Sequence, residues 1–330
     1  EYSVNRHDYF YPNALHLFKH YFYLITFWIR AACWQASGPC FPNKLDRTMK
    51  DKVTVLDIQA MKEAGQPISM ITAYDYPTAQ LVEAAGAEMI LVGDSLAMVV
   101  LGHESTTAIT MDEMVHHAKA VSRGAKRPFL VADMPFMSYH TDVWEAVRNA
   151  GRFVQEAGMD AVKLEGAGRA IELVQAITGA GIPVVAHLGL TPQRATQLGG
   201  FKVQAKTAVA AERLIDDALA LEDAGAVALV LEAVPAPVAA AVTKRLSIPT
   251  IGIGAGAQTD GQVLVFHDML GLFAGFTPRF VKQYANLRPT IVAALESYVD
   301  EVRTREFPTQ AHTFKMRQSE ANLLLYGEGR

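Results

Sequence analysis

The sequence predicts an α/β protein that folds as a (β/α)8 TIM barrel. Eight short apolar runs recur between residues 69 and 270, and most of them lack the polar alternation of a half-exposed strand. Such runs are typical of parallel strands that are covered on both faces. Ala-rich amphipathic segments lie between them, and about eight such repeats in about 230 residues match the count and size of this barrel. A doubly wound open sheet is the alternative, although it usually has fewer strands and a sharper nucleotide fingerprint.

The composition is that of a globular protein with a large core. The 330 residues are 50% hydrophobic and 19% charged, which is enough for a large buried core in one domain or two. The net charge is -4 with both signs interspersed, so a nucleic-acid partner, which needs a basic face, is not expected. No apolar run reaches the roughly 18–20 residues of a membrane span, so no membrane partner is expected either.

The first 48 residues differ from the rest of the chain. Residues 1–48 are rich in Tyr, Phe, His and Trp, and ordinary composition begins at Met49. We therefore expect an N-terminal extension outside the fold, and the apolar run at residues 21–29 makes a targeting peptide the alternative. Cys33 and Cys40, the only cysteines, both lie in this segment, which excludes a disulfide framework and fits a reducing, cytoplasmic location.

The remaining chain divides into three parts. Residues 49–68 include a helix, expected at 54–66, that closes the bottom of the barrel. Residues 69–303 form the catalytic barrel, and residues 304–330 are a polar, loose tail. The expected strands are 69–75, 88–94, 128–136, 160–166, 182–190, 226–234, 248–256 and 263–270.

Helices are expected where amphipathic segments carry start and stop signals. Thr110 and Glu113 have the spacing of a capping box in front of residues 111–122. Gly158, Gly181 and Gly225 follow three further segments, as is typical of helix C-termini. The other expected helices are 142–157, 168–179, 207–224, 236–246 and 279–303.

Polar residues gather where the predicted strands end. The active sites of (β/α)8 barrels lie at the carboxyl ends of the strands. We therefore expect these side chains, which are far apart in the sequence, to face one pocket. They are Asp75, Asp94, Ser95, Asp133, Lys163, Glu165, His187 and Glu232.

Several of these residues also have a purely structural interpretation. A single aspartate at a strand end is usually a helix N-cap or a turn residue, which is the alternative for Asp75, Asp94 and Asp133. Lys163 and Glu165 share one face of a strand and could form a plain ion pair. Their common position at one barrel mouth weakens each of these alternatives.

His187 and Glu232 also have a structural alternative. A lone histidine such as His187 is more often a structural residue than a ligand, and Glu232 could face the helices instead of the pocket.

Three carboxylates, those of Asp94, Asp133 and Glu165, predict a hard divalent cation. Mg²⁺ usually takes one or two carboxylates directly and keeps several waters. A His-rich zinc set is missing from the sequence.

At these positions the sequence closely resembles the ketopantoate hydroxymethyltransferase family. The resemblance is collinear and covers roughly residues 50–315. It rests on the motifs ITAYDY (71–76), LVGDSL (91–96), GHESTTAIT (102–110), ADMPF (132–136), VKLEG (162–166), HLGLTPQ (187–193), GGFKVQ (199–204), LEAVP (231–235), IGIGAG (251–256) and TDGQVLVFHD (259–268).

This resemblance implies a fold and a reaction. Members are barrels of the phosphoenolpyruvate/pyruvate type, and many are large homo-oligomers, often decamers. They use Mg²⁺ and 5,10-methylenetetrahydrofolate to add a hydroxymethyl group to 3-methyl-2-oxobutanoate. The product is 2-dehydropantoate, in the first step of pantothenate biosynthesis.

The resemblance also implies roles for single residues. Asp94 and Asp133 are expected to bind the metal and to touch the substrate, and Glu165 to bind the metal through water. Ser95 is expected to bind the substrate carboxylate, and Lys163 to contact the substrate.

Glu232 is expected to be the catalytic base, and His187 to lie near the substrate. The substrate loses a weakly acidic proton from C3, and the metal stabilises the resulting enolate. Glu232 must be off the metal to remain basic. The C3 carbon carries two methyl groups, so an apolar patch is expected, for which Leu96, Val131 and Val230 are candidates.

Two other functions are compatible with such a barrel. Mg²⁺-dependent lyases and mutases of the same group commonly carry a catalytic cysteine in a K-x-C-G-H-type loop, and the barrel segment contains no cysteine. A catalytically silent, oligomeric scaffold would not need the full set of carboxylates.

Overall fold

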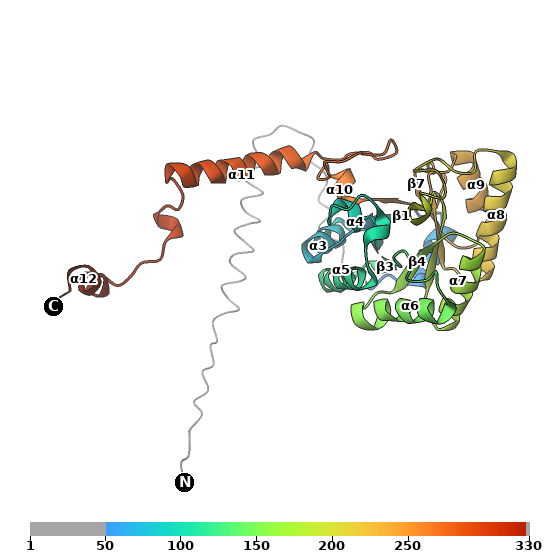
Figure 1. The fold of residues 1–330 in the computed structure, drawn as a ribbon, viewed down its shortest axis with the longest axis horizontal. Helices are drawn as coiled ribbons and strands as arrows, with labels where there is room; N and C mark the ends of the chain where they lie inside the picture. The colour runs from blue at the N-terminus through green and yellow to red at the C-terminus, as the bar shows by residue number, and fades with distance from the viewer. Residues whose placement is uncertain (1–50, 328–330) are drawn as a thin grey trace, which may run out of the picture. The chain divides into compact units, whose positions relative to one another are not determined.

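Eight parallel strands close into a barrel in the order in which they follow one another along the chain. The computed structural model describes residues 51–327, so the predictions for residues 1–48 lie outside the described residues. The barrel confirms the predicted fold class, and Figure 1 shows its ring of strands surrounded by helices. The strands are β1 (Ile68–Thr72), β2 (Met89–Val92), β3 (Phe129–Asp133), β4 (Ala161–Glu165), β5 (Val184–Gly189), β6 (Ala228–Glu232), β7 (Thr250–Ile253) and β8 (Gly261–Leu264).

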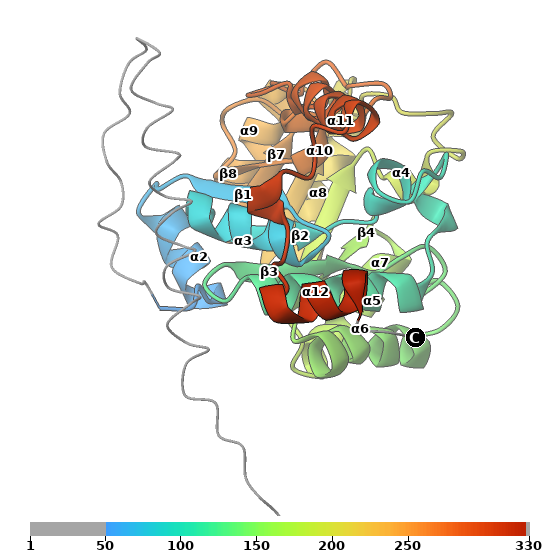
Figure 2. The same ribbon diagram turned by 90° about the vertical axis from the view of Figure 1, so that its left-hand side faces the viewer.

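The helices that connect successive strands lie on the outside of the barrel, as Figure 2 shows from the side. The helices of the described chain are α2 (Val55–Glu63), α3 (Tyr76–Ala85), α4 (Leu96–Val99), α5 (Met111–Gly124), α6 (Val143–Ala157), α7 (Arg169–Gly179), α8 (Ala208–Asp223), α9 (Ala236–Arg245), α10 (Phe266–Met269), α11 (Leu287–Thr304) and α12 (Gln318–Tyr326). In the described part of the chain, no helix combines the length and apolar composition needed to cross a membrane.

Local capping explains where several helices begin and end. The predicted capping box at α5 is present, with Thr110 accepting from the backbone N–H of Glu113. α6 ends at Gly158, whose φ of 65° is in the left-handed region that glycine tolerates. Asp75 is the N-cap of α3, so the structural interpretation is the correct one for this strand-end aspartate.

The last third of the chain departs from the expected repeat. Residues 254–260 connect β7 to β8 without a helix. β8 begins at Gly261, which pairs with both Ile68 and Ile251, and the predicted strand at 263–270 is therefore wrong in its second half. There the backbone N–H of Phe266 donates to Thr72 Oγ1 at 2.9 Å, and α10 begins.

The chain beyond β8 also differs from the prediction. α11 begins at Leu287, eight positions after the expected start at residue 279. The segment expected to be a loose tail contains α12. Neither helix buries a residue.

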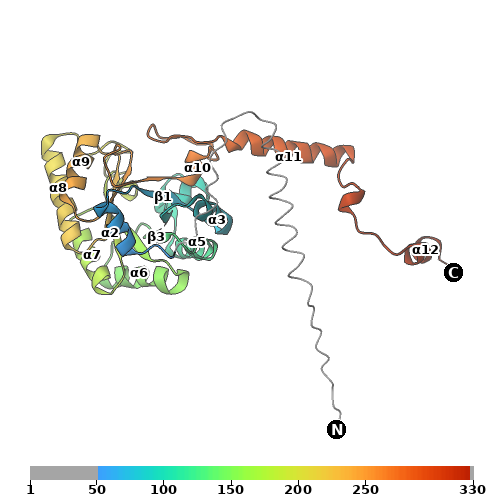
Figure 3. The same cartoon turned by 180° about the vertical axis from the view of Figure 1, so that it is seen from behind.

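The barrel has an interior core that α2 closes at the amino ends of the strands. Figure 3 shows α2 in front of the strands, in the middle of the ring of helices. Ile58 of α2 is completely buried in the interior cluster. Lys62 of the same helix pairs with Asp260 at 2.8 Å, and Asp260 accepts from the backbone N–H of Thr250 at 2.8 Å. Truncating Ile58 to alanine would cost about 2–5 kcal/mol, because the site is enclosed on all sides.

Candidate active site

The interior face of the barrel changes from apolar to charged toward the carboxyl ends of the strands. Successive side chains of a strand point to opposite faces, so every second residue points inward. Val131 of β3 belongs to the interior cluster, and Asp133 is the next residue on its face. On β4 the interior residue Ala161 is followed on the same face by Lys163 and Glu165. All three charged residues are buried.

Two further strands add to this charged layer. Val185 of β5 is interior and is followed on its face by His187, which pairs in register with Glu165. Val230 of β6 is interior and is followed by Glu232. Glu232 therefore lies on the interior face and not among the helices.

Asp94 reaches the same layer from the loop that follows β2. Its backbone N–H donates to Asp133 Oδ2 at 3.0 Å, and its side chain is buried. The preceding Gly93 is where an inward side chain would otherwise stand. A Cβ there would lie 3.0 Å from Ser95 Oγ and 3.5 Å from Asp133 Oδ2, so only glycine leaves this space open.

Lys163 and His187 link the carboxylates of the layer. Lys163 Nζ pairs with Asp133 Oδ1 at 2.9 Å, so the expected alternative of an ion pair with Glu165 on its own strand does not hold. The imidazole Nδ1 of His187 lies 3.3 Å from Lys163 Nζ and 3.3 Å from Glu165 Oε1. Its Nε2 lies 3.3 Å from Glu232 Oε2. With Asp94, six of the predicted residues therefore form one connected cluster.

Ser95 lies beside this cluster with a tyrosine as its partner. Its Oγ is 2.8 Å from the hydroxyl of Tyr74, which follows β1 and is fully buried. Burial raises the pKa of the Tyr74 phenol above its ordinary value, so the phenol stays protonated and available for hydrogen bonding.

The acidic groups have unequal proton affinities. Burial, together with the negative charges of Asp133 and Glu165, raises the pKa of Asp94 well above its usual value. Burial also raises the pKa of Asp133, although Lys163 opposes the effect. At Glu165 burial is outweighed by the hydrogen bond and charge of His187 and by Lys163, so its pKa is lowered. A cation placed among these oxygens would favour ionisation of all three carboxylates.

The basic groups are held in their charged forms by the same carboxylates. Burial disfavours the Lys163 ammonium, but Asp133, Glu165 and Asp94 together raise its pKa above the ordinary value. Burial and the Lys163 charge disfavour protonation of His187, but Glu165 and Glu232 raise its pKa to about 9. The cluster is thus a balanced array of buried charges, which is costly unless each charge has a partner.

The donor set fits a hydrated magnesium ion better than a closed metal cage. Among residues 51–327, no three His, Cys, Asp or Glu side chains surround one point closely enough to hold a metal directly. Mg²⁺ needs only one or two direct carboxylates and keeps its waters, and the layer offers the carboxylates of Asp94, Asp133 and Glu165. Among the described residues, the buried Glu165 Oε1 has only the long 3.3 Å contact with His187 Nδ1 and no hydrogen bond of good geometry, so it can also accept from a metal-bound water.

Two residues of the site were missed by the sequence analysis. Gln193 and Tyr139 are both buried and both hydrogen-bond to groups of the cluster. Neither glutamine nor tyrosine is a preferred Mg²⁺ ligand, and neither residue stands at the end of a predicted strand, so residue type and position gave no signal. Gln193 ends the motif HLGLTPQ, whose presence in the resemblance was the only pointer to it.

The backbone at Glu232 is also specialised. A Cβ on Gly189 of β5 would lie 2.2 Å from the carbonyl oxygen of Glu232, so glycine is required for the two strands to approach here. Ala233 has a φ of 47°, which is strained for a residue with a side chain. This turn directs the chain away from the barrel immediately after Glu232.

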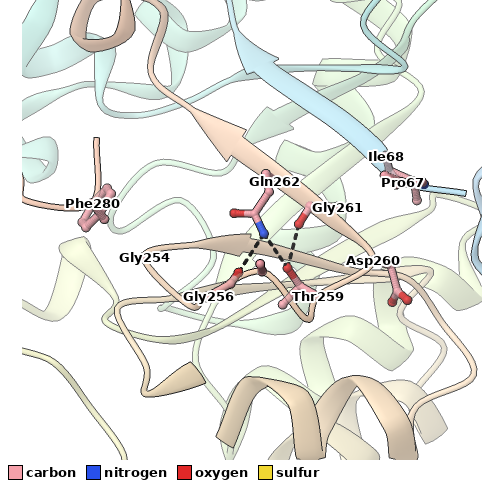
Figure 4. A pocket seen from close by; sticks show the side chains of 10 residues that line it. Pro67, Ile68, Gly254, Gly256, Thr259, Asp260, Gly261, Gln262 and Phe280 are labelled. Atoms are coloured by element: carbon pink, nitrogen blue, oxygen red, sulfur yellow. Dashed lines mark hydrogen bonds between the residues drawn. The ribbon is translucent and has the colours of Figure 1, made fainter. Parts of the chain in front are cut away.

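A hollow of about 440 Å³ lies along the connection between β7 and β8. Figure 4 shows Gln262 of β8 donating to Gly256 and to Thr259 across its floor. None of the site residues lines it, and its one carboxylate, Asp260, is already paired with Lys62. The buried titratable groups therefore lie in the charged layer and not along this hollow.

A closed parallel barrel whose interior ends in buried carboxylates, a lysine and a histidine is the architecture of a (β/α)8 barrel enzyme. Comparisons with known proteins show to which enzyme family the chain belongs. The family model described as ketopantoate hydroxymethyltransferase matches residues 52–310. The chain belongs to this family.

Curated relatives agree over most of the chain. The 3-methyl-2-oxobutanoate hydroxymethyltransferase of Geobacillus kaustophilus (strain HTA426) is 58% identical over 82% of this chain and 97% of that protein. The protein of the same name from Moorella thermoacetica is 59% identical over 81% of this chain and 99% of that protein. The chain is therefore an enzyme, and almost the whole length of these relatives is represented in it.

Solved structures of lower identity support the fold alone. A phosphonopyruvate hydrolase, in complex with oxalate and Mg²⁺, has a TM-score of 0.53 at 14% identity and covers 84% of this chain and 99% of that one. A 2,3-dimethylmalate lyase of the PEP mutase/isocitrate lyase superfamily has a TM-score of 0.51 at 17% identity and covers 79% of this chain and 92% of that one. These likenesses agree with the predicted (β/α)8 barrel.

Proposed function

We propose that this enzyme transfers a hydroxymethyl group from 5,10-methylenetetrahydrofolate to 3-methyl-2-oxobutanoate and forms 2-dehydropantoate, the first step of pantothenate biosynthesis. The names of its relatives support the keto acid and the product. The observation that carries the proposal is the single buried layer in which acidic groups from β2, β3 and β4 meet Lys163, with Glu232 beyond His187.

In this proposal Mg²⁺ is the cofactor, held by Asp94 and Asp133 directly and by Glu165 through water. The bound ion supplies electrophilic stabilisation of the negative charge that develops on the keto oxygen. Lys163, charged and buried beside Asp133, holds the substrate and neutralises the same charge. Ser95 binds the substrate carboxylate.

Glu232 acts as the base that takes the proton from C3. Its distance from the metal ligands is set by His187, which lies between Glu165 and Glu232 and near the substrate. Water hydrolyses the methylene bridge of the folate, which releases formaldehyde and tetrahydrofolate. The carbon nucleophile left by proton removal then adds to the carbonyl carbon of formaldehyde, and the resulting alkoxide takes up a proton to give the hydroxymethyl group.

The floor of the site suits a substrate with a branched apolar end. Val131 and Val230 lie one inward position below Asp133 and Glu232 and belong to the interior cluster. They are placed to contact the two methyl groups on C3. Leu96, a third candidate, is buried in the outer cluster between strands and helices and does not belong to this floor.

We also propose a homo-oligomer, of which a decamer is one form. The support is α11, an 18-residue helix that buries none of its side chains. It exposes an apolar stripe with the 3–4 spacing of a packing face, made of Ile291, Leu295, Tyr298, Val299 and Val302. Such a face on a helix needs a partner, and a second copy of the chain is the occupant we propose.

A cytoplasmic location completes the proposal. The barrel segment contains no cysteine, which suits a reducing compartment.

The test is an assay with 3-methyl-2-oxobutanoate, 5,10-methylenetetrahydrofolate and Mg²⁺, with 2-dehydropantoate measured as the product. Omitting Mg²⁺ should abolish turnover. Mg²⁺ and the keto acid together should raise the melting temperature of the protein more than either alone. Absence of product with all three components present would contradict the proposed function.

A further inference from the structure

We propose that Gln193 is a positioning residue of this active site, which fixes the carboxylate of Asp94 so that one of its oxygens stays available to the metal ion. This role rests on the proposed function, because it presumes that Asp94 is a magnesium ligand. Gln193 itself makes no contact with the reacting atoms and acts through Asp94.

Gln193 lies in the short 3₁₀ turn Pro192–Arg194, which follows β5, and its side chain is buried. Its amide Nε2 donates to Asp94 Oδ2 at 2.8 Å and to the backbone carbonyl of Met134 at 2.9 Å. Both amide protons are therefore used. Within the described residues Asp94 Oδ1 has no such donor, so the bond leaves this oxygen free for another partner.

Tyr139 determines which way the Gln193 amide points. The Tyr139 hydroxyl accepts from the backbone N–H of Glu165 at 3.3 Å, so its own proton is free to go to Gln193 Oε1, at 2.7 Å. With Oε1 occupied in this way, the NH₂ group must face Asp94. A reversed amide would place two acceptors, Oε1 and Asp94 Oδ2, against each other.

The backbone of Gln193 holds a second proposed ligand. Its N–H donates to Glu165 Oε2 at 3.1 Å. Gln193 thus hydrogen-bonds both to Asp94, which follows β2, and to Glu165 of β4. These two strands are not neighbours in the barrel. Groups that orient ligands in this way commonly change metal affinity or activity about 10- to 100-fold when they are removed.

The test compares Gln193→Met, which keeps the length of the side chain but removes its donors, with the wild-type protein. Binding of Mg²⁺ in the presence of the keto acid is measured by isothermal titration calorimetry, alongside kcat and KM. We expect Mg²⁺ affinity to fall about 10- to 100-fold. Gln262→Met, at an exposed position of β8, is the matched control and should bind as the wild type does.

Two further variants separate positioning from simple packing. Gln193→Glu keeps the size of the side chain but sets a carboxylate against Asp94, so it should bind Mg²⁺ more weakly than the wild type. Tyr139→Phe removes only the hydroxyl that orients the amide and should weaken Mg²⁺ binding about 10-fold. Combined with Gln193→Met, it should add little, because both changes break the same chain of hydrogen bonds.

The outcomes are distinct. Wild-type affinity for Mg²⁺ in Gln193→Met or in Gln193→Glu would overturn the positioning role while leaving the proposed function standing. If Gln193→Met does not fold, Tyr139→Phe decides, and unchanged binding in it would overturn the role. A wild-type protein that binds no Mg²⁺ would overturn the proposed function and this role together.

Discussion

The imidazole Nε2 of His187 lies 3.3 Å from the carboxylate oxygen Oε2 of Glu232. The other ring nitrogen, Nδ1, lies 3.3 Å from Glu165 Oε1. One buried histidine therefore separates the proposed base from a proposed metal ligand. This separation has a chemical consequence, because a carboxylate that does not bind the metal keeps its basicity.

Glu232→Gln tests the base directly. The variant should still bind Mg²⁺ and 3-methyl-2-oxobutanoate, but exchange of the C3 proton with deuterated water should slow by at least about 100-fold. Proton NMR of the keto acid follows the exchange without the folate. Exchange at the wild-type rate would remove Glu232 from the role of base.

Asp94→Ala tests the metal site. Calorimetric affinity for Mg²⁺ should fall sharply, because Asp94 is a proposed direct ligand. Asp75→Ala is the control, since Asp75 is also an aspartate at a strand end but caps α3. It should lose about 1 kcal/mol of stability and keep its Mg²⁺ affinity. Equal Mg²⁺ affinity in the two variants would refute the ligand role of Asp94.

Lys163→Met tests the balance of buried charge. Asp133 would lose its partner at 2.9 Å, in a layer that burial already makes unfavourable for carboxylates. Unfolding in urea without Mg²⁺ should show a loss of about 3–5 kcal/mol. Mg²⁺ should restore part of that stability by replacing the missing positive charge. A stability equal to that of the wild type would show that Asp133 does not depend on Lys163.

Asp268 predicts a pH dependence of stability. Burial raises its pKa from 3.8 to about 6, so between these values the folded protein binds more protons than the unfolded chain. The free energy of unfolding should therefore fall as the pH rises through this window. Asp268→Asn should stabilise the protein at about pH 7.5 by roughly 1–2 kcal/mol, allowing for partial solvent screening, and leave it unchanged near pH 4.

Urea unfolding of both proteins at the two pH values checks this. An equal difference between Asp268→Asn and the wild type at both values would mean that ionisation of Asp268 is not the cause.

Leu295→Glu tests the apolar stripe of α11. Leu295 is 59% exposed, and a charge there should oppose any contact that covers the stripe. Light scattering coupled to size-exclusion chromatography should show a smaller assembly than for the wild type. Ser297→Glu adds the same charge to the same helix outside the stripe and should leave the assembly intact. Wild-type mass for Leu295→Glu would contradict the proposed interface.

Prediction from the sequence worked best where the pattern is local. The apolar runs of β2 to β6 are buried on nearly every residue. The lack of polar alternation in their sequence therefore reflects burial on both faces. The capping box of α5 likewise depends on only four consecutive residues. The prediction failed at 263–270, where the chain changes from strand to α10. There the backbone N–H of Phe266 donates to Thr72, which is far away in the sequence.

The candidate site shows the same division. Acidic residues at strand ends could be found from the sequence, but it could not tell which of two similar aspartates caps a helix and which is buried. Asp75 bonds to Thr78, three residues away, whereas Asp94 bonds to Asp133 and Gln193, 39 and 99 residues away.

By itself the sequence determined the barrel and the residues that line its carboxyl end, because strand periodicity and the position of each strand end are properties of neighbouring residues. Only the tertiary structure decided the partners: Lys163 with Asp133, His187 between two glutamates, and Gln193 against Asp94. The physical reason is closure of the barrel. Pairing of the strands, and of β1 with β8, brings into contact side chains whose separation along the chain carries no information about their distance in space.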